Sequence, residues 1–369
     1  MKFNCEKSDL YTGLNDVSRA LSSRASYQLL ECVVIKTLEN EVELTCSDGN
    51  FYIRTTVEAE IEQEGSLAVD TRRFKNIVQH FPEGRLNIAS DEKMLITISG
   101  SGSRSTIAGQ SDIDYPAMRT LFNAPKIHVP QNVLKTMINR VVFAIATGEV
   151  REILNGGFLE IFKDEMRLVG LDGYRLSIQE YDDHFVLPDG KESLSCIVPG
   201  KTLQEIAGML SDKNEHITIH IDSSNIMFVI DKNIVVSQLY GGNYVKYRNL
   251  VPEKWETRAV VKRDELLGAT ERAGLIAKTE NTNIIKLEFK KNKLYVTSKS
   301  DLGEVFEEID IELDGVEMEI AFNGKYLLDI LKNLEDGYCE LLMKGMLTPC
   351  IIKNRDKNMS TYMLMSVRY

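Results

Sequence analysis

The triplet Gly200-Lys201-Thr202 is the segment whose residue types best suit catalysis, because such a triplet can bind nucleotide phosphates between a strand and a helix. A phosphate-binding loop also needs a glycine five residues before the first glycine of the triplet, so that backbone N–H groups can wrap around the phosphates. Ser195 occupies that position, and residues 196–199 are apolar and contain no glycine. A phosphate-binding loop is therefore not predicted. An enzyme or nucleotide-binding protein that uses Lys201 and Thr202 is the alternative hypothesis.

Two other groups of side chains could bind a metal ion. His216 and His220 lie four residues apart on a predicted strand and would share a face, but no cysteine or third histidine is near them in the sequence. We expect solvated surface histidines. The acidic residues of segment 304–312 lack the spacing of a metal loop and are typical of a solvated strand face. Since nucleophile-elbow, HExxH and EF-hand patterns are also missing, we predict no catalytic residues, no metal and no cofactor.

Amphipathic helices recur along the chain in two sets of three. The first set has apolar or small residues at i, i+4, i+7 and i+11, one face of a helix. Its members are Leu10, Leu14, Val17 and Leu21; Leu134, Ile138, Val141 and Ile145; and Leu266, Thr270, Ala273 and Ala277. Ser8, Asn132 and Asp264 precede these residues and are predicted N-caps. The second set is Phe74, Ile77, Val78 and Phe81; Leu203, Ile206, Ala207 and Leu210; and Leu327, Ile330, Leu331 and Leu334.

Segments with period-two alternation, such as 42–46 and 293–297, lie between the helices and indicate antiparallel strands. The sequence therefore predicts an α+β fold of three tandem similar domains, each with two helices packed on an antiparallel sheet. We expect domain 1 at 1–125, domain 2 at 126–253 and domain 3 at 254–369. Three copies joined edge to edge would form an arc, and two arcs closed head to tail would form a dimeric ring without free sheet edges.

Composition restricts the class of protein. The 369 residues carry a net charge of −11, which argues against a protein held on nucleic acid by charge alone. A ring linked topologically to DNA needs only a locally basic lining. The longest apolar runs, such as 32–35, cannot span a bilayer, and the N-terminus lacks the apolar core of a secretory signal. The six cysteines form no CxxC pair, so we expect reduced thiols and a cytoplasmic location.

Cations are distributed over all six predicted helices despite the acidic composition. They are Arg19, Arg24, Arg72, Arg73, Lys75, Arg140, Arg151, Lys201, Arg272, Lys278, Lys325 and Lys332. An exposed helix face with mixed charges is the simpler interpretation. The alternative is a ring lined by helices, with cations inside, where phosphates are contacted loosely and no base is read.

Several strings in order along the whole chain resemble the sliding clamp (beta subunit) family of bacterial DNA polymerase III. They are Met1-Lys2-Phe3, Phe81-Pro82-Glu83-Gly84, Asp114-Tyr115-Pro116, Leu154-Asn155-Gly156, Asp172-Gly173-Tyr174-Arg175-Leu176, 247–252 and 361–369. The resemblance implies a DNA clamp fold and a homodimeric ring around duplex DNA. It also implies a cleft that captures short hydrophobic peptides of the replicative polymerase, the clamp loader and repair proteins, with no catalysis and no membrane contact.

Carried over by position, the resemblance assigns three groups of residues. The partner-peptide cleft would contain Leu154, Leu171, Gly173, Tyr174, Arg175, Leu176, Val245, Leu250, Pro349, Met363, Leu364, Met365, Ser366, Val367 and Arg368. Residues facing DNA would be Arg24, Arg72, Arg73, Arg151 and Lys201. The dimer interface would contain Ile107, Leu275 and Ile276.

The chain departs from the family pattern at each of these sites. Tyr174, Val245 and Asn249 replace the histidine, proline and arginine that are frequent in the cleft, which affects the expected peptide preference. Glu152 and Ile153 stand where some relatives have tyrosines that contact DNA, and Ser105 replaces an interface aromatic residue. A structural repeat protein unrelated to DNA is the third hypothesis.

Overall fold

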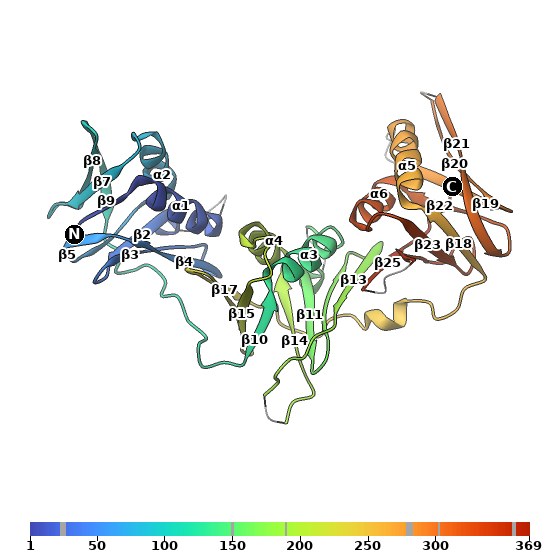
Figure 1. The fold of residues 1–369 in the computed structure, drawn as a ribbon, viewed down its shortest axis with the longest axis horizontal. Coiled ribbons are helices and arrows are strands. Elements are labelled where there is room, and N and C mark those ends of the chain that lie inside the picture. The colour runs from blue at the N-terminus through green and yellow to red at the C-terminus, as the bar shows by residue number, and fades with distance from the viewer. Residues whose placement is uncertain (23–26, 149–150, 189, 278–282, 302, 356–358) are drawn as a thin grey trace. The chain divides into compact units, whose positions relative to one another are not determined.

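The computed structural model describes residues 1–369 except 23–26, 149–150, 189, 278–282, 302 and 356–358 (Figure 1). The chain forms two compact units, one of Met1–Leu134 with Glu205–Leu239 and one of Lys135–Gln204 with Tyr240–Tyr369. Both units therefore contain part of the central third of the sequence. These units do not coincide with the three expected domains, whose boundaries stay a prediction.

The order of elements repeats three times, as a strand, a helix, four or five strands, a second helix and three strands. The first copy consists of β1 (Lys2–Glu6), α1 (Lys7–Val17), the 3₁₀ turns η1 (Ser18–Ala20) and η2 (Gln28–Glu31), β2 (Cys32–Thr37), β3 (Glu41–Ser47), β4 (Phe51–Glu58), β5 (Glu60–Gln63), β6 (Ser66–Asp70), α2 (Thr71–His80), β7 (Arg85–Ser90), β8 (Leu95–Gly100) and β9 (Ser103–Gln110). Helix α1 packs on β4 and beside α2 (Figure 1). A Cβ atom at Gly13 would lie 2.8 Å from Val57 Cγ2, so glycine permits this close approach.

The second copy consists of β10 (Lys126–Pro130), α3 (Gln131–Val142), η3 (Glu152–Asn155), β11 (Gly156–Phe162), β12 (Met166–Leu171), β13 (Arg175–Tyr181), β14 (Ser193–Pro199), α4 (Gly200–Met209), β15 (His216–Ile221), β16 (Asn225–Ile230), β17 (Asn233–Gln238) and then η4 (Tyr247–Leu250). The third consists of β18 (Thr257–Lys262), α5 (Arg263–Ala277), β19 (Ile284–Lys290), β20 (Lys293–Ser300), β21 (Gly303–Gly315), β22 (Met318–Asn323), α6 (Gly324–Asn333), β23 (Tyr338–Met343), β24 (Cys350–Asn354) and β25 (Ser360–Leu364). The three-copy prediction is confirmed.

The residues of the predicted apolar stripes are buried except Leu21 and Ile77, which are half-buried, but the predicted N-caps are wrong. Helices α1, α3 and α5 each begin one residue before the expected cap, so Ser8, Asn132 and Asp264 lie inside the first turn. A residue inside the helix cannot be its N-cap. Caps missed by the sequence are in the second set of helices, where Asp70 accepts the N–H of Arg73, and Asn323 accepts those of Lys325 and Tyr326.

Antiparallel ladders connect the strands of each unit. The first unit has the order β10-β15-β16-β17-β4-β3-β2-β6-β9-β8-β7-β1-β5, in which β17 pairs with β4. The second unit has the order β14-β11-β12-β13-β25-β24-β23-β18-β21-β20-β19-β22, in which β13 pairs with β25. The pairing of β13 with β25 joins the second copy to the third within one unit.

Among the described helices, none combines the length and the apolar character that crossing a membrane would require.

Candidate apolar binding face

The pairing of β13 with β25 builds an apolar surface in the second unit. Met363 lies opposite Leu176 on one side and opposite Ile351 on the other, and Leu176 also faces Leu171. Residues directly opposite in antiparallel strands point to the same side of a sheet, so these side chains are contiguous. We call this surface the β13–β25 face. Its buried residues are Ala146, Leu154, Val169, Leu171, Leu176, Ile178, Ile197, Tyr244, Tyr247, Leu342, Ile351 and Met363.

Partly buried side chains pack at the rim of the β13–β25 face. They are Ile153, Phe158, Tyr240, Val245, Val251 and Met365. The structure therefore brings together six of the residues expected in the cleft: Leu154, Leu171, Leu176, Val245, Met363 and Met365. Of these, Val245 and Met365 keep accessible surface.

Leu364 was expected in the cleft but points elsewhere. Successive residues of β25 alternate between two faces, and Tyr362 and Leu364 are fully buried in the core of the third copy. Met363 between them belongs to the β13–β25 face. The side chain of Leu364 is thus a core group, which corrects its assignment to the cleft surface.

Arg175 is also buried, with only 8% of its surface exposed. Its guanidinium donates to Asp172 Oδ2 at 2.9 Å and to Asp329 Oδ2 at 2.5 Å, and it lies 4.4 Å from the ring centroid of Tyr326. Asp172 also accepts the N–H groups of Tyr174 and Arg175, each at 2.9 Å. Arg175 therefore fixes the turn before β13 to α6 and positions its neighbours.

Tyr174 lies in that turn and is exposed. It is 59% exposed, and its ring stacks on Tyr326 with centroids 5.7 Å apart. Its carbonyl oxygen accepts the N–H of Met365 at 2.8 Å, which places the tyrosine next to the chain segment that carries the rim methionine. The preceding Gly173 has φ +92°, a conformation that favours glycine.

The remaining expected residues are accessible to different extents. Gly173, Leu250 and Arg368 are exposed, and Pro349, Ser366 and Val367 are half-buried. The N–H of Val367 donates to the carbonyl of Ala321 at 2.8 Å, so the C-terminal segment follows β22. Met346 and Leu347, which are 52% and 58% exposed, precede Pro349 in its loop. The sequence reasoning missed them. The sequence shows two apolar residues shortly before a proline, but it does not show that they are exposed.

The segment that carries Val245 is anchored on both sides. Tyr244 stacks on Phe158 with centroids 4.8 Å apart, and the Tyr247 hydroxyl donates to Glu160 Oε2 at 2.5 Å. Burial, followed by the hydrogen bond to Glu160, raises the pKa of Tyr247. A neutral hydroxyl donor therefore holds this segment on β11.

The expected DNA-facing cations differ in their surroundings. Arg72 and Arg73 are exposed in the first turn of α2, and neither has a carboxylate partner among the described residues. Arg151 precedes η3 and Lys201 lies in the first turn of α4, and both are exposed. Arg24 lies outside the described residues.

Other helix cations are paired with carboxylates of elements that are distant in the sequence. Arg19 contacts Glu205 at 3.3 Å, Arg140 contacts Glu335 at 3.1 Å, and Arg272 contacts Glu307 at 2.6 Å. These three guanidinium groups are therefore less available to phosphates than the sequence suggested.

The alternative nucleotide site lacks the geometry it needs. Strand β14 ends at Pro199 and α4 begins at Gly200, so no loop of free N–H groups separates them. Thr202 is only 2% exposed. His220, expected at the surface, is buried: its Nδ1 lies 3.2 Å from the carbonyl of Ala124, and its ring packs edge-on to Phe122. Within the described ranges, no cluster of three or more side chains has metal-binding geometry.

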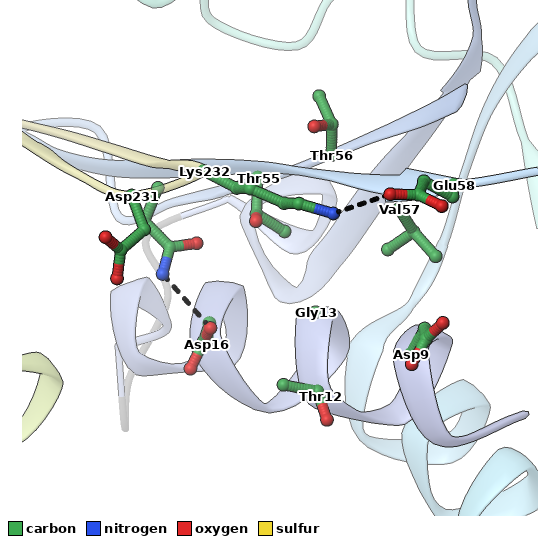
Figure 2. A pocket seen from close by; sticks show the side chains of 11 residues that line it. Asp9, Thr12, Gly13, Asp16, Thr55, Thr56, Val57, Glu58, Asp231 and Lys232 are labelled. Atoms are coloured by element: carbon green, nitrogen blue, oxygen red, sulfur yellow. Dashed lines mark hydrogen bonds and ion pairs between the residues drawn. The ribbon is translucent and has the colours of Figure 1, made fainter. Parts of the chain in front are cut away.

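A separate hollow of about 400 Å³ lies in the first unit between α1, β4 and the turn before β17 (Figure 2). Asp9, Asp16, Glu58 and Asp231 line it, and Lys232 donates to Glu58 at 3.3 Å. Four carboxylates against one ammonium group would repel phosphates, so this hollow is also unsuited to a nucleotide.

Besides β5, β10, β14 and β22, which end the two sheets, two described strands leave part of one edge unpaired. Strand β9 pairs with β6 only at Gly109 and Gln110, and β21 pairs with β18 only from Ile311 onward. The second edges of 103–108 and 303–310 are therefore open. The expected interface residues lie nearby: Ile107 is half-buried on β9, and on α5 Leu275 is 71% exposed and Ile276 half-buried. A hollow of about 630 Å³ next to Ser105 is lined by β9 and α2.

Comparison with known proteins gives a consistent result over the whole chain. The sequence matches the DNA polymerase III beta subunit family in its N-terminal domain at 1–119, its central domain at 128–246 and its C-terminal domain at 248–368. The beta sliding clamp of Bacillus subtilis strain 168 is 29% identical over 379 residues, covering 100% of both chains. A DNA polymerase III beta subunit structure from Eubacterium rectale has a TM-score of 0.96 and 30% identity, again over 100% of both chains. The sliding clamp structure from Bacillus subtilis has a TM-score of 0.96 and 28% identity, covering 100% of this chain and 99% of the other.

Proposed function

This chain belongs to the DNA polymerase III beta subunit family, and we propose that it is a sliding clamp that encircles duplex DNA and tethers the replicative polymerase. Three tandem domains of one fold extend over the chain, and we place them at 1–125, 126–253 and 254–369. In this proposal the protein acts by encircling DNA and by binding peptides, and it catalyses no reaction. We place it in the cytoplasm. The observation that carries the proposal is the β13–β25 face, with its accessible Met365 and Val245.

The β13–β25 face suits short hydrophobic peptides of several partners: the polymerase, the clamp loader and repair proteins. Methionine is unbranched and adapts to differently shaped apolar side chains. Met365 provides such a group at the rim, and Tyr174 adds an exposed aromatic ring beside it. A peptide side chain inserted there would contact apolar atoms already held rigid by the sheet.

The two open strand edges support a homodimer. If β9 of one copy pairs with β21 of another, the same contact occurs twice and closes a head-to-tail ring. Leu275 could then enter the hollow beside Ser105 of the second copy, with Ile107 and Ile276 adjacent. Arg72, Arg73, Arg151 and Lys201 would face the DNA, as would Arg24.

Retention on circular DNA tests the proposal. The protein, loaded with its clamp loader onto a nicked circular duplex, should remain bound through gel filtration and should dissociate once the circle is cut at one site. A matched linear duplex with blocked ends should also retain it. Equal loss from closed circles and open linear DNA would refute encirclement.

A further inference from the structure

Phe306 is a large apolar side chain on the open edge of β21. It is 63% exposed and stacks on Tyr295 with centroids 5.5 Å apart. Its neighbour Glu307 pairs with Arg272 of α5, and Val305 packs against the core under that helix. Since side chains alternate along a strand, Phe306 lies on the sheet face that points away from α5, together with Glu304 and Glu308.

Arg104 occupies the corresponding face of the open edge of β9. Ser105 lies opposite Ile98 and Ile107 lies opposite Ile96, and both of these partners are fully buried. Ser105 and Ile107 therefore point to the core side, and Arg104 points outward, where it is exposed.

We propose that, in the dimer proposed above, Phe306 of one copy packs on the Arg104 guanidinium of the second copy, on the outer face of the β9–β21 pair. A guanidinium placed over an aromatic ring is attracted by the ring's electron-rich face. Glu304 and Glu308 flank Phe306 on the same face. Because Glu308 is paired with Lys293 at 2.6 Å, Glu304 is the carboxylate that can also attract Arg104.

A second copy is the occupant that fits both edges. The β21 edge is acidic and aromatic, and the β9 edge has Arg104 and small residues such as Ser105 and Thr106. On the core side of β9 the open edge carries Ser105 and the aliphatic Ile107 and no aromatic ring, so the aromatic contact area comes from Phe306 on the outer side.

Dimer dissociation constants, measured by dilution with fluorescently labelled chains, test this contact. Phe306→Ala and Arg104→Ala should each raise the dissociation constant roughly fivefold, and the double variant should be little weaker than either single variant. Phe306→Tyr, which keeps the ring, should dimerise like the unchanged protein. Val316→Ala, at another exposed apolar residue of the same unit, is the matched control and should change nothing.

The outcomes separate this inference from the proposed function. The Phe306–Arg104 contact alone would be overturned if the dimer is stable and Phe306→Ala leaves its dissociation constant unchanged. It would also be overturned if the double variant raises the dissociation constant by the product of the two single effects. An unchanged protein that stays monomeric at micromolar concentration would overturn the dimer itself. Phe306 is exposed in the single chain, so thermal unfolding of Phe306→Ala should match the unchanged protein when both are dilute enough to be monomeric, which excludes misfolding as the cause.

Discussion

Leu364 and Met365 are adjacent, yet substitution by alanine should mainly reduce stability at Leu364 and mainly reduce peptide binding at Met365. Leu364 is fully buried in the core of the third copy, so Leu364→Ala should lower the free energy of unfolding by about 3 kcal/mol through lost burial and a residual cavity. Met365 is half-buried at the rim of the β13–β25 face, and Met365→Ala should cost about 1 kcal/mol or less. The Met365 variant should instead bind a partner peptide roughly tenfold more weakly, since an apolar contact is lost.

Two measurements on each variant decide the matter. Urea denaturation followed by circular dichroism gives stability, and fluorescence anisotropy of a labelled peptide from the cognate polymerase gives affinity. Folded Leu364→Ala protein should bind the peptide normally. Weak binding by a stable Leu364→Ala variant, together with normal binding by Met365→Ala, would refute the assignment of the two side chains to opposite faces.

Three further predictions concern charge, protonation and thiols. Arg72→Glu with Arg73→Glu should shorten retention on nicked circles at low salt and have little effect at high salt, because screening weakens phosphate contacts; equal effects at both would remove the pair from the DNA-facing surface. Burial raises the pKa of Glu180, so its ionised form is disfavoured in the folded state. Glu180→Gln should therefore have a higher free energy of unfolding in urea denaturation, and this difference should shrink as the pH falls through the raised pKa towards the ordinary value of 4.5. Burial raises the pKa of Cys46 to about 12, so only roughly one thiol in ten thousand is ionised at pH 8, and Ellman's reagent should react quickly only after denaturant is added.

The repeated architecture could be predicted because it depends on periodic burial. The stripes at Leu10, Leu134 and Leu266 recur at matching places, and helix periodicity survives changes in side-chain size. The first residue of each helix could not be predicted with the same accuracy as the repeat. A serine, asparagine or aspartate suits a cap by type, but whether it stands outside the first turn depends on where the preceding strand ends, as β1 does at Glu6.

The sequence was enough to predict which segments form the cleft, but not which of their side chains are accessible. Family position located 171–176 and 363–368, but the direction of each side chain depends on strand register. Leu176, which family position assigns to the cleft, is 1% exposed, and a charged substitution there would disrupt the sheet. Met365 lies just after β25 and keeps accessible surface, so it is the better position for that test.

The availability of each cation depended on contacts that are distant in the sequence. Arg272 is paired with Glu307 and Arg140 with Glu335, and nothing in the local sequence around either arginine indicates its partner. Arg72 and Arg73 have no such partner within the described part of the chain. An acidic protein that neutralises part of its own helix cations has few left for phosphates. Its attraction to DNA is then weak and independent of base sequence, which suits a ring that must stay on the duplex and still move along it.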